Sequence, residues 1–109
     1  LPFFLEELGL GFSFIKNEYK IKIGDRYYYI DFLLFNYIDN CFVVLELKNT
    51  EVKKEHFGQI KTYMNYIDKN IKTSNQNPTL GIILCKKDNK FVFEYVPNDN
   101  IIDREHALV

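Results

Sequence analysis

The stretch that decides the fold is residues 41–72, "CFVVLELKNTEVKKEHFGQIKTYMNYIDKNIK", because the spacing of its apolar residues changes partway along. Its opening is an almost unbroken apolar run, which is typical of a buried strand. From residue 53 onward the apolar side chains recur every three or four positions, as they do on one side of an amphipathic helix. The sequence therefore predicts a strand over 41–48 and a helix over 53–72.

The flanking segments continue this alternation of elements. Residues 14–23 alternate between apolar and polar side chains, as in a half-buried strand, and Gly24-Asp25 after them is typical of a tight turn. Further along the chain, "TSNQNP" has the composition of a loop, which ends at Asn77-Pro78. The order α-β-β-β-α-β-β predicts an α/β fold: an antiparallel meander, a helical crossover, and a mixed sheet of about five strands flanked by helices. The expected elements are a short helix in the opening "LPFFLEELGLGF" that stops at Gly9, strands over 14–23, 27–35 and 41–48, the helix over 53–72, and strands over 80–85 and 91–96.

Composition narrows the class of protein. A chain of 109 residues is expected to form one domain, and its net charge of −1 gives no general electrostatic reason to expect nucleic acid as a partner. Cys41 and Cys85 lie in separate apolar runs and lack the spacing of metal-binding cysteines. We therefore expect them to be reduced thiols in the core of a cytoplasmic protein, and a disulfide is the less favoured alternative. No apolar run approaches membrane-spanning length, so no membrane partner is expected. Because the chain starts at Leu1 rather than Met, we expect it to be part of a longer protein.

An acid and an amine stand together at the end of the central strand. Side chains alternate between the faces of a strand, so Glu46 and Lys48 share one face. If the preceding hairpin turn is centred between Ile38 and Asp39, Asp31 lies directly opposite Glu46, with Cβ atoms ~5 Å apart. An extra residue in the turn would move Asp31 to the other face, so the pairing depends on the type of turn.

Two carboxylates that face each other repel, and the apolar surroundings increase the cost. Lys48 could supply part of the compensating charge, but Mg²⁺ is the better answer, because it takes oxygen ligands at ~2.1 Å and uses one or two carboxylates. Asp31, Glu46 and the main-chain carbonyl of Leu47 are the expected ligands, and Mn²⁺ could substitute. The alternative is that Glu46 and Lys48 are ordinary surface charges. An aspartate inside "YYYIDFLLF" weakens that alternative, because acids are rare among so many apolar residues.

These residues resemble a known signature. Asp31, a spacer of fourteen residues and then Glu46-Leu47-Lys48 resemble the D…(E/D)xK pattern of the PD-(D/E)XK nuclease superfamily, whose restriction-endonuclease-like core follows an α-β-β-β-α-β order. "FLEELGLGFSF", "FGQIKTYMNYID" and "NPTLGIILCKKD" extend the likeness to the C-terminal nuclease domain of YhcG-type proteins over nearly the whole chain. One departure is that Ile30, rather than proline, precedes Asp31.

The resemblance implies a metal-dependent nuclease that hydrolyses phosphodiester bonds, with DNA as the expected substrate. It implies that Glu7 of the first helix and Gln59 of the later helix point into the site. It also implies an N-terminal, DNA-contacting region in the parent protein, and it leaves a homodimer open. The alternative is a catalytically silent copy that binds nucleic acid or a protein partner. The intact set of Asp31, Glu46 and Lys48 favours catalysis over that alternative.

Three neighbours of Gln59 carry weaker expectations. Tyr63 follows it by one helical turn and is expected either in the cleft or in the core. His56 is expected to be a solvated helix residue rather than a phosphate ligand. Gly58 is expected to permit close packing of the helix on the sheet.

Overall fold

The computed structural model describes residues 5–98, which form two helices and five strands. The order of elements confirms the predicted α-β-β-β-α-β-β order, and residues 1–4 of the predicted opening helix lie outside the described residues. Neither described helix is long and apolar enough to span a membrane. The elements are α1 (Leu5–Leu8), β1 (Phe12–Ile23), β2 (Arg26–Asn36), β3 (Cys41–Leu47), α2 (Lys54–Asn70), β4 (Asn77–Lys87) and β5 (Lys90–Val96).

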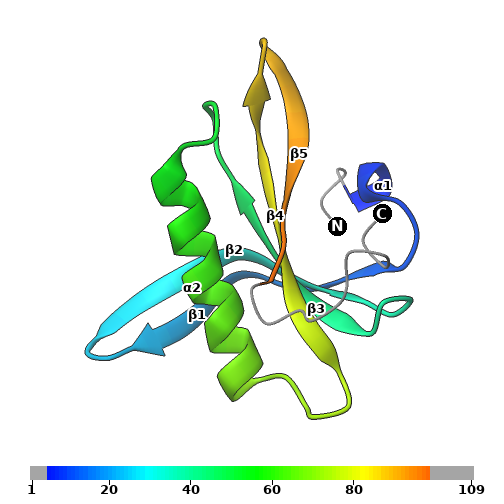
Figure 1. Cartoon of the computed structure of the whole chain (residues 1–109), viewed down its shortest axis with the longest axis vertical. Helices are drawn as coiled ribbons and strands as arrows, with labels where there is room; N and C mark the ends of the chain where they lie inside the picture. Colours follow the sequence, from blue (N-terminus) through cyan, green and yellow to red (C-terminus); the bar gives the residue numbers. More distant parts are fainter. Residues whose placement is uncertain (1–4, 99–109) are drawn as a thin grey trace.

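All five strands belong to one mixed sheet, in the order β1-β2-β3-β4-β5 (Figure 1). The pairs β1–β2, β2–β3 and β4–β5 are antiparallel, whereas β3 and β4 are parallel and are joined by the crossover through α2. The predicted fold class, an α/β mixed sheet with flanking helices, is therefore confirmed.

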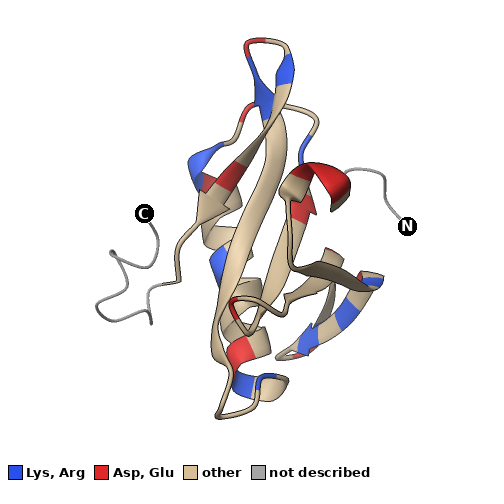
Figure 2. Ribbon diagram, turned by 90° about the vertical axis from the view of Figure 1, so that its right-hand side faces the viewer, with Lys and Arg blue, Asp and Glu red and all other residues tan. Residues whose placement is uncertain are grey.

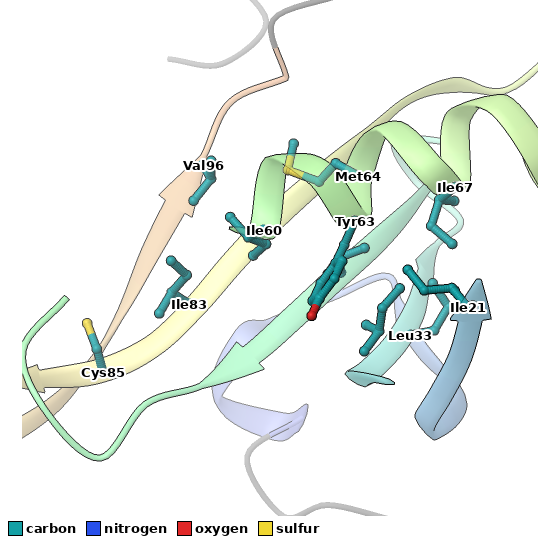
Figure 3. Packing of buried hydrophobic residues seen from close by; sticks show 11 residues of the cluster. Ile21, Leu33, Ile60, Tyr63, Met64, Ile67, Ile83, Cys85 and Val96 are labelled. Atoms are coloured by element: carbon teal, nitrogen blue, oxygen red, sulfur yellow. The ribbon is translucent and has the colours of Figure 1, made fainter. Parts of the chain in front are cut away.

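Two apolar clusters cover the two faces of the sheet. Along β3, Val44 packs with the α2 cluster, and Val43 and Leu45 pack with the cluster on the other face, where α1 contributes Leu8. This alternation places residue 46 on the face that α2 covers. Cys41 and Cys85 are both buried, as the sequence predicts for core residues, and they lie in different clusters. The buried residues of the α2 cluster include Ile21, Leu33, Ile60, Tyr63, Met64, Ile67, Ile83 and Val96 (Figure 3).

The start of β4 differs from the expectation, because Asn77-Pro78 belongs to the strand rather than to the preceding loop. Asn77 pairs with Cys41, and its side-chain Nδ2 donates to the carbonyl of Asp39 at 2.7 Å. A shift of register follows between Cys41 and Val43. Proline has no N–H for the ladder, and an irregularity of this kind is where a strand tolerates it.

A buried polar cluster fixes the second half of α2 on the sheet. Asp68 Oδ1 accepts hydrogen bonds from the main-chain N–H and the hydroxyl of Thr79, at 2.9 and 2.7 Å. Its Oδ2 accepts from Asn98 Nδ2 at 2.9 Å. These bonds connect α2, β4 and the segment after β5, so the helix has a defined position over the strands.

The close approach of α2 to the sheet occurs at a different glycine from the one expected. Gly58 lies on the exposed side of α2, and an added Cβ there would meet no described atom within 4 Å. At Gly81 of β4, an added Cβ would lie 2.7 Å from Met64 Sδ and 3.1 Å from Ile60 Cδ1. The expectation for Gly58 was wrong because helical spacing alone does not show which residue faces the sheet.

These two glycines form a matched pair of stability tests. Gly81→Ala is expected to destabilise the fold by about 1–3 kcal/mol, because Met64 must leave its position in a filled core. Gly58→Ala is expected to stabilise it by up to about 1 kcal/mol, because alanine loses less backbone entropy in a helix and meets open space. Urea unfolding of the two variants measures both effects. Equal changes in the two would contradict the packing described here.

Candidate active site where two strands separate

The site lies where β2 and β3 stop pairing. Their antiparallel ladder runs from Asn36–Cys41 to Phe32–Leu45, in the register that a turn centred between Ile38 and Asp39 predicts. Beyond this point β2 continues to Arg26 in partnership with β1, whereas β3 continues beside β4. Residues 19–30 therefore extend from the sheet as a two-stranded arm (Figure 1).

Asp31 and Glu46 occupy the point of separation. Glu46 Oε2 accepts a hydrogen bond from the main-chain N–H of Asp31 at 2.8 Å. Asp31 Oδ2 accepts one from the N–H of Leu47, also at 2.8 Å. Each carboxylate thus binds the main chain of the opposite strand just past the last ladder pair. The predicted juxtaposition of the two acids is confirmed, and their chemical roles stay predictions.

Glu46 is the buried member of this acid pair, with a side chain only 5 % exposed. Burial is the main cause that raises its pKa from 4.5 to about 7, and the charge of Asp31 raises it further. The hydrogen bond from the Asp31 N–H and the charge of Lys48 act in the opposite direction. Glu46 is therefore close to a change of charge at neutral pH, as acids in functional sites often are.

Lys48 follows the last residue of β3 and is half-buried. Its main-chain N–H donates to the carbonyl of Leu84 on β4 at 2.8 Å, which fixes its backbone beside the site. Its positive charge lowers the pKa of Glu46, so its ammonium group acts on the acid pair electrostatically. The structure thus brings Lys48 close to Glu46, the second of the two predicted acids.

Glu7 lies near Lys48 rather than with Asp31 and Glu46. Its helix α1 packs on the face opposite α2, and Glu7 lines a pocket together with Leu47, Lys48 and Asn49. Within residues 5–98, no three His, Cys, Asp or Glu side chains are arranged to hold a metal ion. The structure therefore brings Glu7 to Lys48, and it does not place Glu7 with Asp31 and Glu46 as a third acid.

Gln59 on α2 is connected to the acid pair only indirectly, by a hydrogen bond to Tyr63. Its exposed side chain hydrogen-bonds that of Tyr63, which is buried against the ring of Tyr28 with centroids 6.3 Å apart. Figure 3 shows Tyr63 pointing from α2 toward the sheet. Burial raises the pKa of Tyr63 most, and the charges of Glu46 and Asp31 raise it further. The expected core role of Tyr63 is confirmed, and the charges of Glu46 and Asp31 act on this buried residue.

His56 has a structural role that the sequence reading missed. Its Nδ1 accepts a hydrogen bond from the main-chain N–H of Lys53 at 3.0 Å and closes the first turn of α2. The sequence feature that could have predicted this role is the position of His56, three residues after the helix cap Lys53. A side-chain acceptor at that position can accept a hydrogen bond from the main-chain N–H of the cap residue. His56 is therefore a capping residue rather than a simply solvated one.

The donor set fits a hard divalent cation. Two carboxylates supply oxygen ligands, and the burial of Glu46 beside the charged Asp31 leaves negative charge that a cation would compensate. Mg²⁺ is commonly held by one or two carboxylates and completes its shell with water and phosphate oxygens. A third acid is therefore not required for the fit.

A mixed sheet in this order, with two acids where its central strands separate and a lysine two residues after the second acid, defines the class of PDDEXK nuclease folds. Within that class, the model of the YhcG PDDEXK nuclease domain family matches residues 1–103, and the chain belongs to that family. The protein named "Putative nuclease YhcG" from Escherichia coli (strain K12) is 29% identical over 82 residues. The alignment covers 75% of this chain and 22% of that relative's length. No solved structure matches the chain.

The raised pKa of Glu46 makes a prediction for metal-free protein. A carboxyl whose folded pKa exceeds its unfolded value favours the folded state fully at low pH, and this contribution is lost as pH rises from about 4.5 to about 7. At 1.36 kcal/mol per unit, the loss is on the order of 3 kcal/mol. Wild type in chelator should therefore lose stability between pH 5 and 8, and Glu46→Gln should lose less. Urea titrations at both pH values measure this difference. Glu51→Gln, an exposed control, should follow wild type.

Proposed function

We propose that this domain is a metal-dependent nuclease that hydrolyses phosphodiester bonds in DNA. The observation that carries the proposal is the pair of reciprocal hydrogen bonds that holds Asp31 and Glu46 where β2 and β3 separate, close to the charge of Lys48 that acts on Glu46. Membership of the YhcG PDDEXK nuclease domain family supports the same reaction class.

Asp31, Glu46 and the main-chain carbonyl of Leu47 would hold Mg²⁺, which Mn²⁺ can replace. When bound, the ion polarises the scissile phosphate and lowers the pKa of a coordinated water. Glu46 has to be ionised to serve as a ligand, and its pKa of about 7 in the metal-free domain falls when a cation is adjacent. The two acids therefore position the ion, and the hydrogen bonds from the opposite strands position the acids.

Lys48 orients the attacking water or stabilises the negative charge that develops on the phosphate in the transition state. Gln59 acts from α2 through its hydrogen bond to Tyr63, whose pKa the charges of Glu46 and Asp31 raise. Glu7 acts from α1 on the side of Lys48, with which it shares a pocket. We place the domain in the cytoplasm, a proposal that the two buried cysteines support, because no disulfide joins Cys41 to Cys85.

The test is cleavage by the full-length protein of linear DNA, branched DNA and RNA, each with Mg²⁺, with Mn²⁺ and with chelator. We expect metal-dependent cutting of DNA and none after Glu46→Gln. Cleavage that persists in chelator would contradict the metal site, and cleavage of RNA alone would contradict DNA as the substrate. Binding without cleavage of any substrate would instead identify a silent binding module.

A further inference from the structure

The arm, residues 19–30, has one covered face and one open face. Ile21, Tyr28 and Ile30 turn toward α2 and pack in its cluster. The residues between them turn the other way, where Tyr27 and Tyr29 are 54 % and 52 % exposed. The open face is therefore built from the alternate residues of both strands.

Four side chains on this open face form what we call the arm patch, which consists of Lys20, Lys22, Tyr27 and Tyr29. Lys20 lies directly opposite Tyr29 and Lys22 directly opposite Tyr27, so amines and rings alternate in both directions. The Nζ atoms of Lys20 and Lys22 lie 4.3 and 5.5 Å from the centre of the Tyr27 ring. Figure 2 shows basic segments spaced along the arm.

This alternation provides two kinds of contact at once. The amines of Lys20 and Lys22 both lie close to the Tyr27 ring, and a polyanion would relieve the repulsion between these two like charges. The exposed ring of Tyr29 offers a flat surface on which a base can stack, and the ring of Tyr27 offers one when a base displaces the ammonium groups that lie over it. Bases in a duplex are already stacked on one another, so these rings add binding energy only where bases are unpaired.

The arm patch is continuous with the acid pair along β2. Tyr29 precedes Asp31 by two residues, which corresponds to ~7 Å along a strand. A chain of nucleotides on the open face would therefore pass close to Asp31, and it would turn at the junction of β2 and β3 to reach Glu46, which lies on the face that α2 covers. The chain as a whole carries a formal charge of −1, so the attraction for phosphate is local to the arm.

We infer that the arm patch binds single-stranded nucleic acid, the unpaired segment next to the phosphate that is cut. The inference rests on the proposed nuclease function for the position of that phosphate, but the binding itself does not require catalysis. Lys20 and Lys22 contact the backbone, and Tyr27 and Tyr29 stack on bases.

The first experiment measures binding in chelator, where cleavage cannot interfere. Full-length protein is titrated into a fluorescent oligothymidylate and into a duplex of the same length. Tyr27→Ala/Tyr29→Ala should weaken binding of the single strand about tenfold or more and leave duplex binding unchanged. Tyr27→Phe/Tyr29→Phe should retain binding, because phenylalanine keeps the stacking face. Tyr95→Ala, which removes a similarly exposed ring on β5, should bind like wild type.

A second measurement isolates the amines. Lys20→Ala/Lys22→Ala should reduce the slope of log K against log salt for the single strand by about 1.4, or about 0.7 for each lost phosphate contact. An unchanged slope would overturn the assignment of these lysines to the backbone. Alanine variants of the tyrosines that bind the single strand like wild type, or that weaken duplex binding equally, would overturn the arm patch as a single-strand site.

Cleavage with Mg²⁺ then separates this inference from the nuclease proposal. If wild type cuts a duplex that has an unpaired tail and the tyrosine variants bind and cut it equally well, the arm patch is wrong and the nuclease stands. If wild type cuts nothing but the tyrosine variants lose single-strand binding, the nuclease proposal fails and the arm patch stands.

Discussion

Lys48→Ala is expected to reduce the rate of DNA cleavage by a factor on the order of 10² or more, while metal binding survives. In the proposed mechanism the amine stabilises charge that develops only in the transition state, and loss of one such group typically has an effect of this size. Its loss leaves Asp31 and Glu46 in place, because their hydrogen bonds involve main-chain N–H groups rather than the lysine side chain. The result therefore tests chemistry separately from ion binding.

Three measurements on one preparation check this expectation: the cleavage rate with Mg²⁺, the thermal shift with Mn²⁺ and the affinity for uncut DNA in chelator. Only the first should change strongly, because one lost phosphate contact alters affinity modestly. Lys87→Ala is the matched control, since it removes the same charge from an exposed position on β4. If Lys48→Ala and Lys87→Ala cut at the same rate as wild type, Lys48 has no catalytic role.

Asp31→Asn is expected to abolish both the stabilisation by metal and cleavage. Asparagine keeps an oxygen that can accept the hydrogen bond from the Leu47 N–H, so the junction of the strands should persist. The substitution removes the negative charge that Mg²⁺ requires, and it also relieves repulsion with Glu46, so the metal-free variant should be slightly more stable than wild type.

Thermal unfolding in millimolar Mn²⁺ and in chelator measures this effect. For wild type, an ion at ten times its Kd adds about 1.4 kcal/mol, whereas the variant should show no difference. Asp25→Asn, an exposed aspartate in the turn of the arm, should keep the full metal effect. A wild-type melting temperature that is equal in Mn²⁺ and chelator would contradict the metal site itself.

The register of β2 and β3 could be predicted from the sequence because the hairpin turn is short and regular. Asn36 Oδ1 accepts from the N–H groups of Ile38 and Asp39, at 3.0 and 2.9 Å, and Asn40 takes a positive φ of 54°. Asparagine suits both roles. With the turn fixed, a period of two along each strand was enough to place Asp31 opposite Glu46.

The separation of the strands could not be predicted in the same way. A strand pattern shows which face a residue takes, but it does not show where pairing stops, because here carboxylates accept main-chain hydrogen bonds just beyond the ladder. The position of Glu7 could not be predicted from the sequence either, because the face of the sheet on which the short α1 packs depends on contacts of Leu8 with residues distant in the chain. The close approach at Gly81 likewise depends on the crossover that brings Met64 over β4.

Because β2 and β3 separate at the acid pair, any movement of the arm relative to the sheet would also move Asp31 relative to Glu46. Regular pairing resumes only at Phe32–Leu45, so bending of the arm about this pair changes the distance between Asp31 on one strand and Glu46 on the other. A ligand that prefers one bend of the arm therefore alters the affinity of the acid pair for a cation. By thermodynamic reciprocity, the cation alters the affinity of the arm for that ligand by the same factor. If the arm and the acid pair bind their ligands as proposed, cooperativity between the two positions is the expected consequence of where the ladder ends.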